Sequence, residues 1–459
     1  MRTLGRESVR AAQPYQPTSM SFFPFFQRHT FARGIHPDAH KSTAGSPIRR
    51  LPFAPRMILP LAQHIGKPAL PTVVVGQEVV RGEPIAKPDG FVSLPLHAPA
   101  DGVIEAIDLR PSVRGPWVPA ITLRAYEAST QEVRWGQPRD IDAMTPQQIL
   151  AAIQDAGIAG MGGAAFPAHA KLIPPKGAMI ETLIVNGAEC EPYLTCDHRV
   201  MLEYTQDVML GIRLAMRACG AKRAIIGVED NKPDAIAMLR AGLPADGAIS
   251  VEAVVTKYPQ GAADTLIYAL TGREVPIGER TSSIGVLLSN VMTMAYIGRL
   301  VPAGQGVIER VVTVTGLGVA RPGNYLVPLG TPLRYLLDFA GAVATDRQII
   351  LGGPMMGESA ASLDVSTIKG TSGVLVIPQP PPAQGRIYPC IKCGECVNVC
   401  PKGLNPSMLG MLAARGEYES MAEYHISECF ECGSCSYVCP SHIPLVQQFR
   451  VAKGMLRKK

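Results

Sequence analysis

Eight of the eleven cysteines lie between positions 390 and 439, at a spacing typical of iron–sulfur proteins. They form two copies of the pattern C-x2-C-x2-C-x3-C-P, at Cys390, Cys393, Cys396 and Cys400, and at Cys429, Cys432, Cys435 and Cys439. In two-cluster domains, three cysteines of each copy bind one cluster and the fourth binds the other cluster. The pattern therefore predicts one [4Fe–4S] cluster on Cys390, Cys393, Cys396 and Cys439, and a second on Cys429, Cys432, Cys435 and Cys400.

Two zinc sites are the alternative for the same cysteines. Structural zinc sites usually combine paired C-x2-C arms, whereas three cysteines fall within each short loop of this chain. The spacing therefore favours iron–sulfur clusters. The remaining cysteines, Cys190, Cys196 and Cys219, are expected to be small buried apolar side chains.

A second segment that could do chemistry is "GMGGAAFPAHAKL", from Gly160 to Leu172. Glycine has no Cβ, so a ligand can approach its backbone closely. The segment matches neither GxGxxG nor GxxxxGK[ST]. Taken alone, it is equally compatible with an ordinary connection between a helix and a strand.

The elements around this loop predict a parallel α/β sheet. A helix is expected after Thr145, with Pro146 at its first position, and a buried strand is expected to end at Asn186. A helix over 207–218, a strand over 224–230, a helix from about 233 and a strand from 249 follow. Alternating strands and helices favour a parallel sheet, which binds ligands at the carboxyl ends of its strands. Asn186, Glu189, Glu191 and Tyr258 follow such ends.

Composition limits the classes of protein that the chain can form. Its 459 residues are enough for about three or four domains. No uncharged apolar run reaches 18 residues, so no membrane span is expected, and the first residues do not resemble a secretory signal. The formal net charge of +6 is mild, and no basic and aromatic array indicates nucleic-acid binding.

Two further modules are expected, together with helices between the cysteine loops. Residues 73–107 resemble the lipoyl/biotinyl barrel-sandwich hybrid, with Phe91 near the position of the cofactor-bearing lysine of such carriers, so we expect a docking or structural module without a swinging arm. Residues from Arg310 predict strand, turn, strand and helix, and resemble a β-grasp domain that binds soluble ligands. Between the cysteine loops, helices are expected after Asn405 and over 417–427.

Most of the chain resembles a known family. "GMGGAAFPAHAK" and "NGAECEP" resemble the flavin-binding segments of the NADH-oxidising flavin subunit of respiratory complex I. With "RGIHPDAHK", "KYPQGAADTLIYALTG" and both cysteine loops in the same order, the chain from about residue 30 is similar to the C subunit of the Rnf/Rsx electron transport complex.

This resemblance implies cofactors and site residues. FMN is expected at the glycine-rich loop, and NADH is expected as substrate. The implied flavin contacts are Gly160, Gly162, Gly163, Lys171, Asn186, Glu189, Tyr258 and Asn290. Phe166 and Glu191 match positions that meet the dinucleotide, and Glu191 is the candidate that orients it. If the segment is extended, Glu189 and Glu191 face the same side and line one pocket.

The resemblance also implies a setting and leaves two alternatives open. The expected function is transfer of electrons between NADH, FMN and two clusters, to or from an iron–sulfur subunit and integral membrane subunits, coupled to ion translocation. The chain would be peripheral, held by its partners at the cytoplasmic face of the bacterial inner membrane. Met161, Ala188, Ala262 and Ala263 depart from the complex I pattern. Of these, Ala188, Ala262 and Ala263 leave a non-catalytic electron-transfer scaffold open as an alternative. A cobalamin reductase-type protein, which shares these modules, is the second alternative.

The expected fold class is a multidomain α/β protein. The expected order is a disordered extension (1–30), a barrel-sandwich hybrid (31–135), a Rossmann-like FMN/NADH domain (136–303), a β-grasp domain (304–376), a Pro-rich linker (377–387) and an α-helical ferredoxin domain with two clusters (388–459).

Overall fold

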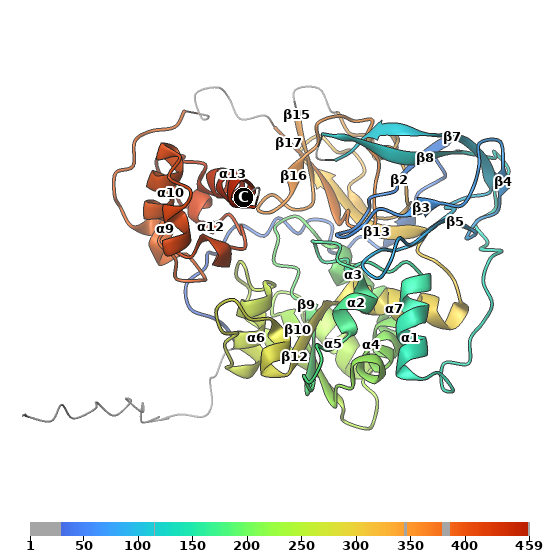
Figure 1. Cartoon of the computed structure of the whole chain (residues 1–459), viewed down its shortest axis with the longest axis horizontal. Helices are drawn as coiled ribbons and strands as arrows, with labels where there is room; N and C mark the ends of the chain where they lie inside the picture. The colour runs from blue at the N-terminus through green and yellow to red at the C-terminus, as the bar shows by residue number, and fades with distance from the viewer. Residues whose placement is uncertain (1–28, 114, 344–346, 379–385, 458–459) are drawn as a thin grey trace, which may run out of the picture.

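The computed structural model describes residues 29–113, 115–343, 347–378 and 386–457 (Figure 1). The expected N-terminal extension falls almost entirely outside the described residues, as do positions 379–385 of the expected linker. Among the described residues, no helix combines the length and the apolar composition needed to cross a membrane.

The barrel-sandwich part consists of two small sheets. One has the order β2 (Arg56–Pro60), β8 (Trp117–Ala125), β7 (Gly102–Pro111) and β4 (Glu78–Val79), and the other has the order β3 (Leu70–Pro71), β5 (Pro84–Lys87) and β6 (Leu96–His97). Met57, Leu59, Ile104, Ile121 and Leu123 are fully buried in its core. These short strands, which are separated by turns containing glycine and proline, agree with the expected barrel-sandwich hybrid.

The central part contains the expected parallel sheet, in the order β11 (Ile249–Val254), β10 (Arg223–Glu229), β9 (Thr182–Gly187) and β12 (Val286–Asn290). Its helices are α1 (Pro146–Asp155), α2 (Ala168–Leu172), α3 (Cys196–Glu203), α4 (Thr205–Cys219), α5 (Pro233–Ala241), α6 (Ala263–Thr271) and α7 (Val291–Ala303). As predicted, Thr145 caps α1, where it forms a capping box with Gln148.

A six-stranded sheet covers the carboxyl-end region of the parallel sheet. Its order is β1 (Ile48–Arg50), β14 (Gly323–Pro328), β13 (Glu309–Gly316), β17 (Gly373–Pro378), β15 (Arg347–Leu351) and β16 (Glu358–Ser359). Strands β13 and β14 and helix α8 (Leu333–Phe339) are the strand, turn, strand and helix that the sequence predicts.

The cysteine-rich part is helical. Its elements are α9 (Glu395–Asn398), α10 (Pro406–Arg415), α11 (Ser420–Glu423), the 3-10 helix η2 (Ile426–Glu428), α12 (Ser434–Tyr437) and α13 (Leu445–Leu456). Asn405 caps α10, and Gly416 ends it in the left-handed conformation, as expected. The helix expected over 417–427 is instead split into α11 and η2, because His425 adopts a left-handed φ of 56° between them.

Residues 29–50 join these parts although they were expected to open the barrel domain. His29 bridges to Val254 of β11, Ile35 pairs with Tyr258, and β1 completes the six-stranded sheet. The backbone N–H of Gly34 also donates to the carbonyl of Val399 in the cysteine-rich part, at 3.1 Å. This N-terminal segment therefore contacts three of the four folded parts before the first barrel strand begins at Arg56.

Candidate functional site

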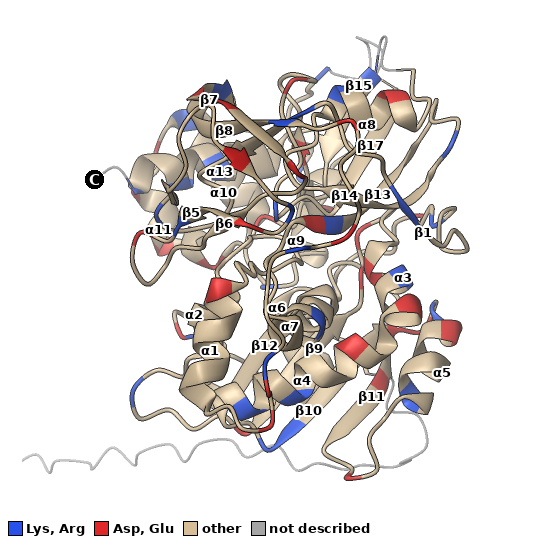
Figure 2. Ribbon diagram, turned by 90° about the vertical axis from the view of Figure 1, so that its right-hand side faces the viewer, with Lys and Arg blue, Asp and Glu red and all other residues tan. Residues whose placement is uncertain are grey.

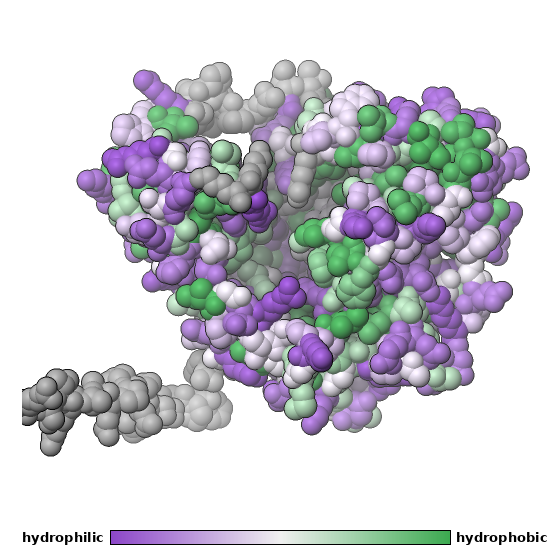
Figure 3. Space-filling model, viewed as in Figure 1, coloured by the Kyte–Doolittle hydropathy of each residue, from purple (hydrophilic) through white to green (hydrophobic). Residues whose placement is uncertain are grey.

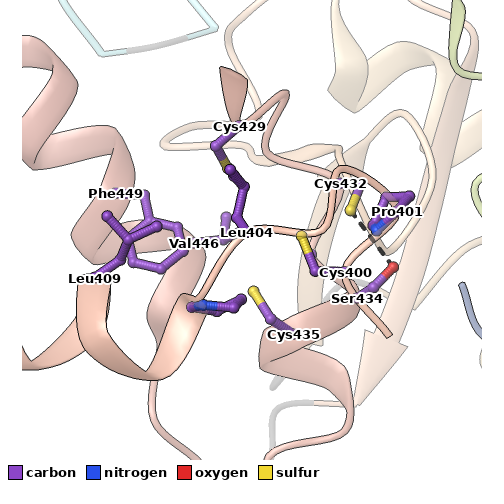
Figure 4. A pocket seen from close by; sticks show the side chains of 12 residues that line it. Cys400, Pro401, Leu404, Leu409, Cys429, Cys432, Ser434, Cys435, Val446 and Phe449 are labelled. Carbon is purple, nitrogen blue, oxygen red and sulfur yellow. Dashed lines mark hydrogen bonds between the residues drawn. The ribbon is translucent and has the colours of Figure 1, made fainter. Parts of the chain in front are cut away.

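Four cysteines surround one pocket in the cysteine-rich part. Figure 4 shows the side chains of Cys400, Cys429, Cys432 and Cys435 around a common space, beside apolar residues that include Leu409 and Phe449. Burial raises the pKa of the Cys429 thiol to about 11, and it also raises the pKa of Cys435. Four thiols in an apolar cage fit a [4Fe–4S] cluster, and this set joins Cys400 to the second cysteine loop, as the pattern predicts.

The other four cysteines are also neighbours. Besides burial, the charges of Cys393, Cys439 and Cys390 raise the pKa of Cys396, so these three side chains lie close to Cys396. Cys390 and Cys393 are exposed, whereas Cys400 and Cys435 of the other set are buried. The two sets are adjacent, because Cys396 packs against the same apolar cluster that contains Cys435.

The glycine-rich loop lies beside the end of β12 and the start of α7. The N–H of Gly160 donates to the carbonyl of Phe166 at 2.7 Å, and the N–H of Met161 donates to Oγ1 of Thr293 at 2.9 Å. Gly162 packs on Asn290, where a Cβ would lie 2.8 Å from the Asn290 Cβ. Gly163 has a φ of 141°, and a Cβ there would meet open space. The loop thus has an anchored base and an open face.

Lys171 supplies a cation on α2, directly after this loop. Its side chain is exposed and has no hydrogen bond or ion pair with any residue that the structure describes. The surrounding protein nevertheless desolvates the ammonium group and lowers its pKa. An exposed cation beside the glycine-rich loop that has no partner among the described residues fits the phosphate group of FMN, so the residues present are compatible with this cofactor.

Asn186 and Asn290, the two expected asparagine contacts, are fixed by their own chain. The amide of Asn186 donates to the carbonyl of Gly261 at 2.8 Å and accepts from the N–H of Ala188 at 3.0 Å. Asn290 caps α7 by accepting from Met292 and Thr293, and its Nδ2 donates to Asp197 at 2.6 Å. Both side chains therefore shape the ends of β9 and β12.

Glu189 has a structural partner that the sequence did not indicate. Its carboxylate accepts from the N–H groups of Asp197 and His198, at 2.7 and 3.3 Å, and so holds the start of α3. Glu189 also adopts a left-handed φ of 51°. The segment is therefore not extended as expected, and the alternation that would place Glu189 and Glu191 on the same side does not apply.

Glu191 lies against the six-stranded sheet. Its carboxylate oxygens accept from the N–H groups of Met355 and Met356, at 3.0 and 2.8 Å. A Cβ at Gly353 would overlap this carboxylate, so the glycine turn after β15 fits closely around it. Burial raises the pKa of Glu191 to about 7, against the two N–H donors and the charge of Lys41, which lower it.

Lys41 is a residue of this site that the sequence analysis did not assign. Its Nζ donates to the carbonyls of Glu189, Glu191 and Leu194, at 2.7, 2.8 and 2.6 Å. One ammonium group therefore fixes the whole acidic loop after β9. The only signal in the sequence was its place in "RGIHPDAHK", because a contact between residues about 150 positions apart has no local pattern.

Tyr258 connects the central part to the second cysteine loop. Its side chain is almost fully buried, and its hydroxyl donates to the carbonyl of Cys432 at 2.6 Å. The same loop lies close to the six-stranded sheet, because a Cβ added at Gly433 would lie 3.0 Å from the carbonyl oxygen of Met355. In the view of Figure 3, the surface is hollowed between the cysteine-rich part and the rest of the molecule.

Phe166, the other expected contact for the dinucleotide, is half-buried within the glycine-rich loop.

The alanines that replace acidic residues of the complex I pattern lie at the end of a strand and at the start of a helix. The carbonyl of Ala188 accepts from Nζ of Lys232 at 2.7 Å, and Lys232 pairs with Glu229 at 3.1 Å. Ala262 and Ala263 stand at the start of α6.

Figure 2 shows that acidic and basic residues are interspersed along α3, α4 and α5 beside the sheet.

Four family models match successive parts of the chain. They are the RnfC barrel sandwich hybrid domain (29–127), the Nuo51 FMN-binding domain (153–299), the SLBB domain (311–359) and a 4Fe-4S dicluster domain (389–443). Together they support an FMN site in the central part and two [4Fe–4S] clusters in the cysteine-rich part.

Three relatives are similar over most of the chain, and each is the C subunit of its complex. The protein of the ion-translocating oxidoreductase complex of Edwardsiella ictaluri is 42% identical over 93% of this chain and 54% of its own length. The Haemophilus influenzae protein of the same name is 42% identical over 93% of this chain and 66% of its own. The protein of the proton-translocating ferredoxin:NAD(+) oxidoreductase complex of Clostridium ljungdahlii is 41% identical over 92% and 93%. The chain thus spans 54% to 93% of these relatives.

Two solved structures of an NAD+-reducing [NiFe]-hydrogenase are also similar. The air-oxidized form is 20% identical with a TM-score of 0.47, and the match covers 62% of this chain and 57% of the other. The H2-reduced form is 21% identical with a TM-score of 0.49, and the match covers 68% and 63%.

Proposed function

Because the chain belongs to the RnfC family of ion-translocating oxidoreductase complexes, we propose that it transfers electrons between NAD(H) and protein partners through FMN and two [4Fe–4S] clusters. The observation that carries this proposal is the hydrogen bond from Tyr258 to Cys432. It joins the domain with the flavin loop directly to a loop of cluster cysteines. The proposed FMN site and the proposed clusters would therefore belong to one continuous structure.

The chemistry needs a group that converts pairs of electrons into single electrons. When bound, FMN accepts a hydride and passes electrons on one at a time, which iron–sulfur clusters require. The chain's own task is to hold this group. The open backbone at Gly163 and the free ammonium of Lys171 are the groups that would bind its ring and phosphate. Asn186, Asn290 and Glu189 keep the surrounding strand and helix ends in place.

Glu191 and Phe166 are the proposed contacts for the dinucleotide. The carboxylate of Glu191 already accepts two backbone hydrogen bonds, from Met355 and Met356, which hold it in one orientation. Lys41 fixes the backbone on both sides of it. A carboxylate held in this way can accept further hydrogen bonds from a ribose without reorganising.

The fold types of the two larger sheets, the partner subunits and the cellular location are part of the same proposal. The parallel sheet would be Rossmann-like and the six-stranded sheet a β-grasp fold. The domain limits 136–303, 304–376 and 388–459 would stand, whereas the barrel would begin near Arg56 rather than at residue 31, because residues 29–50 pair with the other parts. The partners would be an iron–sulfur subunit and integral membrane subunits of the complex. They would hold the chain at the cytoplasmic face of the inner membrane, where its electron transfer is coupled to ion translocation.

A direct experiment tests the proposed function. The purified chain with FMN and reconstituted clusters should reduce ferricyanide with NADH, and NADH should bleach the visible absorbance of the clusters. Bleaching by dithionite but not by NADH would contradict the proposal and favour the non-catalytic scaffold, which Ala188, Ala262 and Ala263 keep as the alternative. Reduction of cobalamin in preference to ferricyanide would favour the cobalamin reductase-type alternative.

A further inference from the structure

The turn between β5 and β6 of the barrel, residues 88–95, lies against the glycine-rich loop and α2. The carbonyl of Phe91 accepts a hydrogen bond from Nε2 of His169 at 2.8 Å. The two rings also meet edge to face, with centroids 5.3 Å apart and planes at 83°. His169 is 2% exposed and lies two residues before Lys171 on the short helix α2.

A second set of contacts fixes the loop itself. Leu94 of the barrel forms a small buried apolar cluster with Ala159 and Ala165, on either side of the glycines. The N–H of Ile65 donates to the carbonyl of Ala165 at 3.2 Å. Ala165 adopts a left-handed φ of 52°, a conformation that is uncommon for alanine and must be held by its surroundings.

The turn is itself rigid. The hydroxyl of Ser93 accepts from the N–H of Asp89 and donates to the carbonyl of Lys67, both at 2.9 Å. From α1, Nε2 of Gln154 donates to the carbonyl of Ser93 at 3.3 Å. In a carrier domain this turn bears the mobile cofactor, whereas here it is bound on both sides and carries Phe91.

We propose that the barrel positions the flavin site: its 88–95 turn holds the glycine-rich loop and α2 in the conformation that binds FMN, through Phe91 with His169 and Leu94 with Ala165. This inference rests on the proposed FMN site at the loop. A loop rich in glycine is costly to order, so contacts that order it before binding strengthen binding. Phe91 and His169 are positioning residues, since neither needs to touch the cofactor.

The test is FMN binding by the full chain after removal of flavin, measured by quenching of flavin fluorescence. Phe91→Ala keeps the carbonyl but removes the ring contact, and it should raise the Kd for FMN about two- to tenfold. His169→Leu should weaken binding further, and His169→Gln, which keeps a donor, should restore part of it. Trp117→Ala is the matched control, because Trp117 is a barrel aromatic of similar exposure, 65% against 56% for Phe91, on another strand.

Hydrogen exchange supplies the second readout. In Phe91→Ala the amides of residues 160–172 should exchange faster, while barrel amides and iron content remain as in the wild type. The inference is overturned if Phe91→Ala and His169→Leu bind FMN with the wild-type Kd, or if Trp117→Ala weakens binding equally. If the wild-type chain itself does not bind FMN, the proposed function fails, which is a distinguishable result.

Discussion

The hydroxyl of Tyr258 donates a hydrogen bond to the carbonyl of Cys432, so a residue that follows the parallel sheet touches the backbone of a cysteine that is proposed to bind a cluster. Through this contact the set formed by Cys400, Cys429, Cys432 and Cys435 lies next to the central domain. The other set includes the exposed Cys390 and Cys393.

Removal of the Tyr258 hydroxyl should slow electron transfer without loss of cofactors. Tyr258→Phe keeps the ring but breaks the bond to Cys432, and a hydrogen bond of this kind contributes about 0.5–1.5 kcal/mol. We expect stopped-flow bleaching of the clusters by NADH to slow about two- to tenfold. FMN and iron contents should stay unchanged. Tyr268→Phe, a partly exposed tyrosine on α6, is the control, and equal rates in both variants would contradict the prediction.

Cys400→Ser should damage the cluster held by the distant second loop. The wild-type chain should bind about eight iron atoms, and the variant about four, because Cys400 lines the pocket of Cys429, Cys432 and Cys435. Iron analysis together with electron paramagnetic resonance would identify the surviving cluster. Cys219→Ser, a buried mid-chain cysteine, should keep all the iron. Zinc in the purified protein, or loss of the cluster bound by Cys390, would refute this assignment.

Gly163→Val should abolish FMN binding. A valine would put methyl groups into the open space at Gly163, and its φ of 141° is unfavourable for a β-branched residue. The clusters should remain, because the cysteine-rich part has its own apolar core. Flavin content by absorbance checks this, with Gly45→Val as control, since Gly45 also faces open space but has no left-handed backbone. Full flavin occupancy in Gly163→Val would remove the loop from the site.

Glu191→Gln should impair the use of NADH but not the binding of cofactors. Loss of a charge-assisted hydrogen bond is worth about 1.5–3 kcal/mol, or roughly ten- to a hundredfold in kcat/KM for NADH. Bleaching by dithionite should be unaffected. Because burial raises the pKa of Glu191 to about 7, the wild-type efficiency should rise as the pH increases through 7, and this rise should vanish in the variant. An unchanged pH profile would show that Glu191 has no such role.

Lys369 should make the stability depend on pH. It is fully buried, its Nζ donates to the carbonyls of Pro95 and Gly157, and burial lowers its pKa from 10.5 to about 7. Between these values the unfolded chain binds a proton that the folded chain does not. The free energy of unfolding should therefore rise with pH from 7 to 10, by up to about 1.4 kcal/mol per unit.

Urea unfolding at pH 7.5 and 9.5 would measure this effect. Lys369→Met replaces the amine by an apolar side chain of similar length, and it should flatten the dependence on pH. Lys67→Met, at an exposed lysine of the barrel, should keep it. A slope of the opposite sign in the wild type would contradict the assignment to Lys369.

The sequence by itself determined the features that depend on local patterns. The cysteine spacing predicted both cluster sets, because three ligands of each set fall within one short loop and the cysteine before the proline belongs to the other cluster in this pattern. Thr145, Asn405 and Gly416 marked helix ends through short-range hydrogen bonds and backbone preferences. The alternation of apolar runs predicted the parallel sheet. These signals are local, so they do not need the rest of the fold.

Only the tertiary structure decided which groups the site residues touch. Glu189 holds the start of α3, Glu191 is held by Met355 and Met356, and Lys41 reaches a loop about 150 residues away. The docking of the Phe91 turn on α2 likewise joins two domains. Such contacts form when separate elements pack, and their energy depends on distance and burial rather than on neighbours in the chain, so no local pattern encodes them.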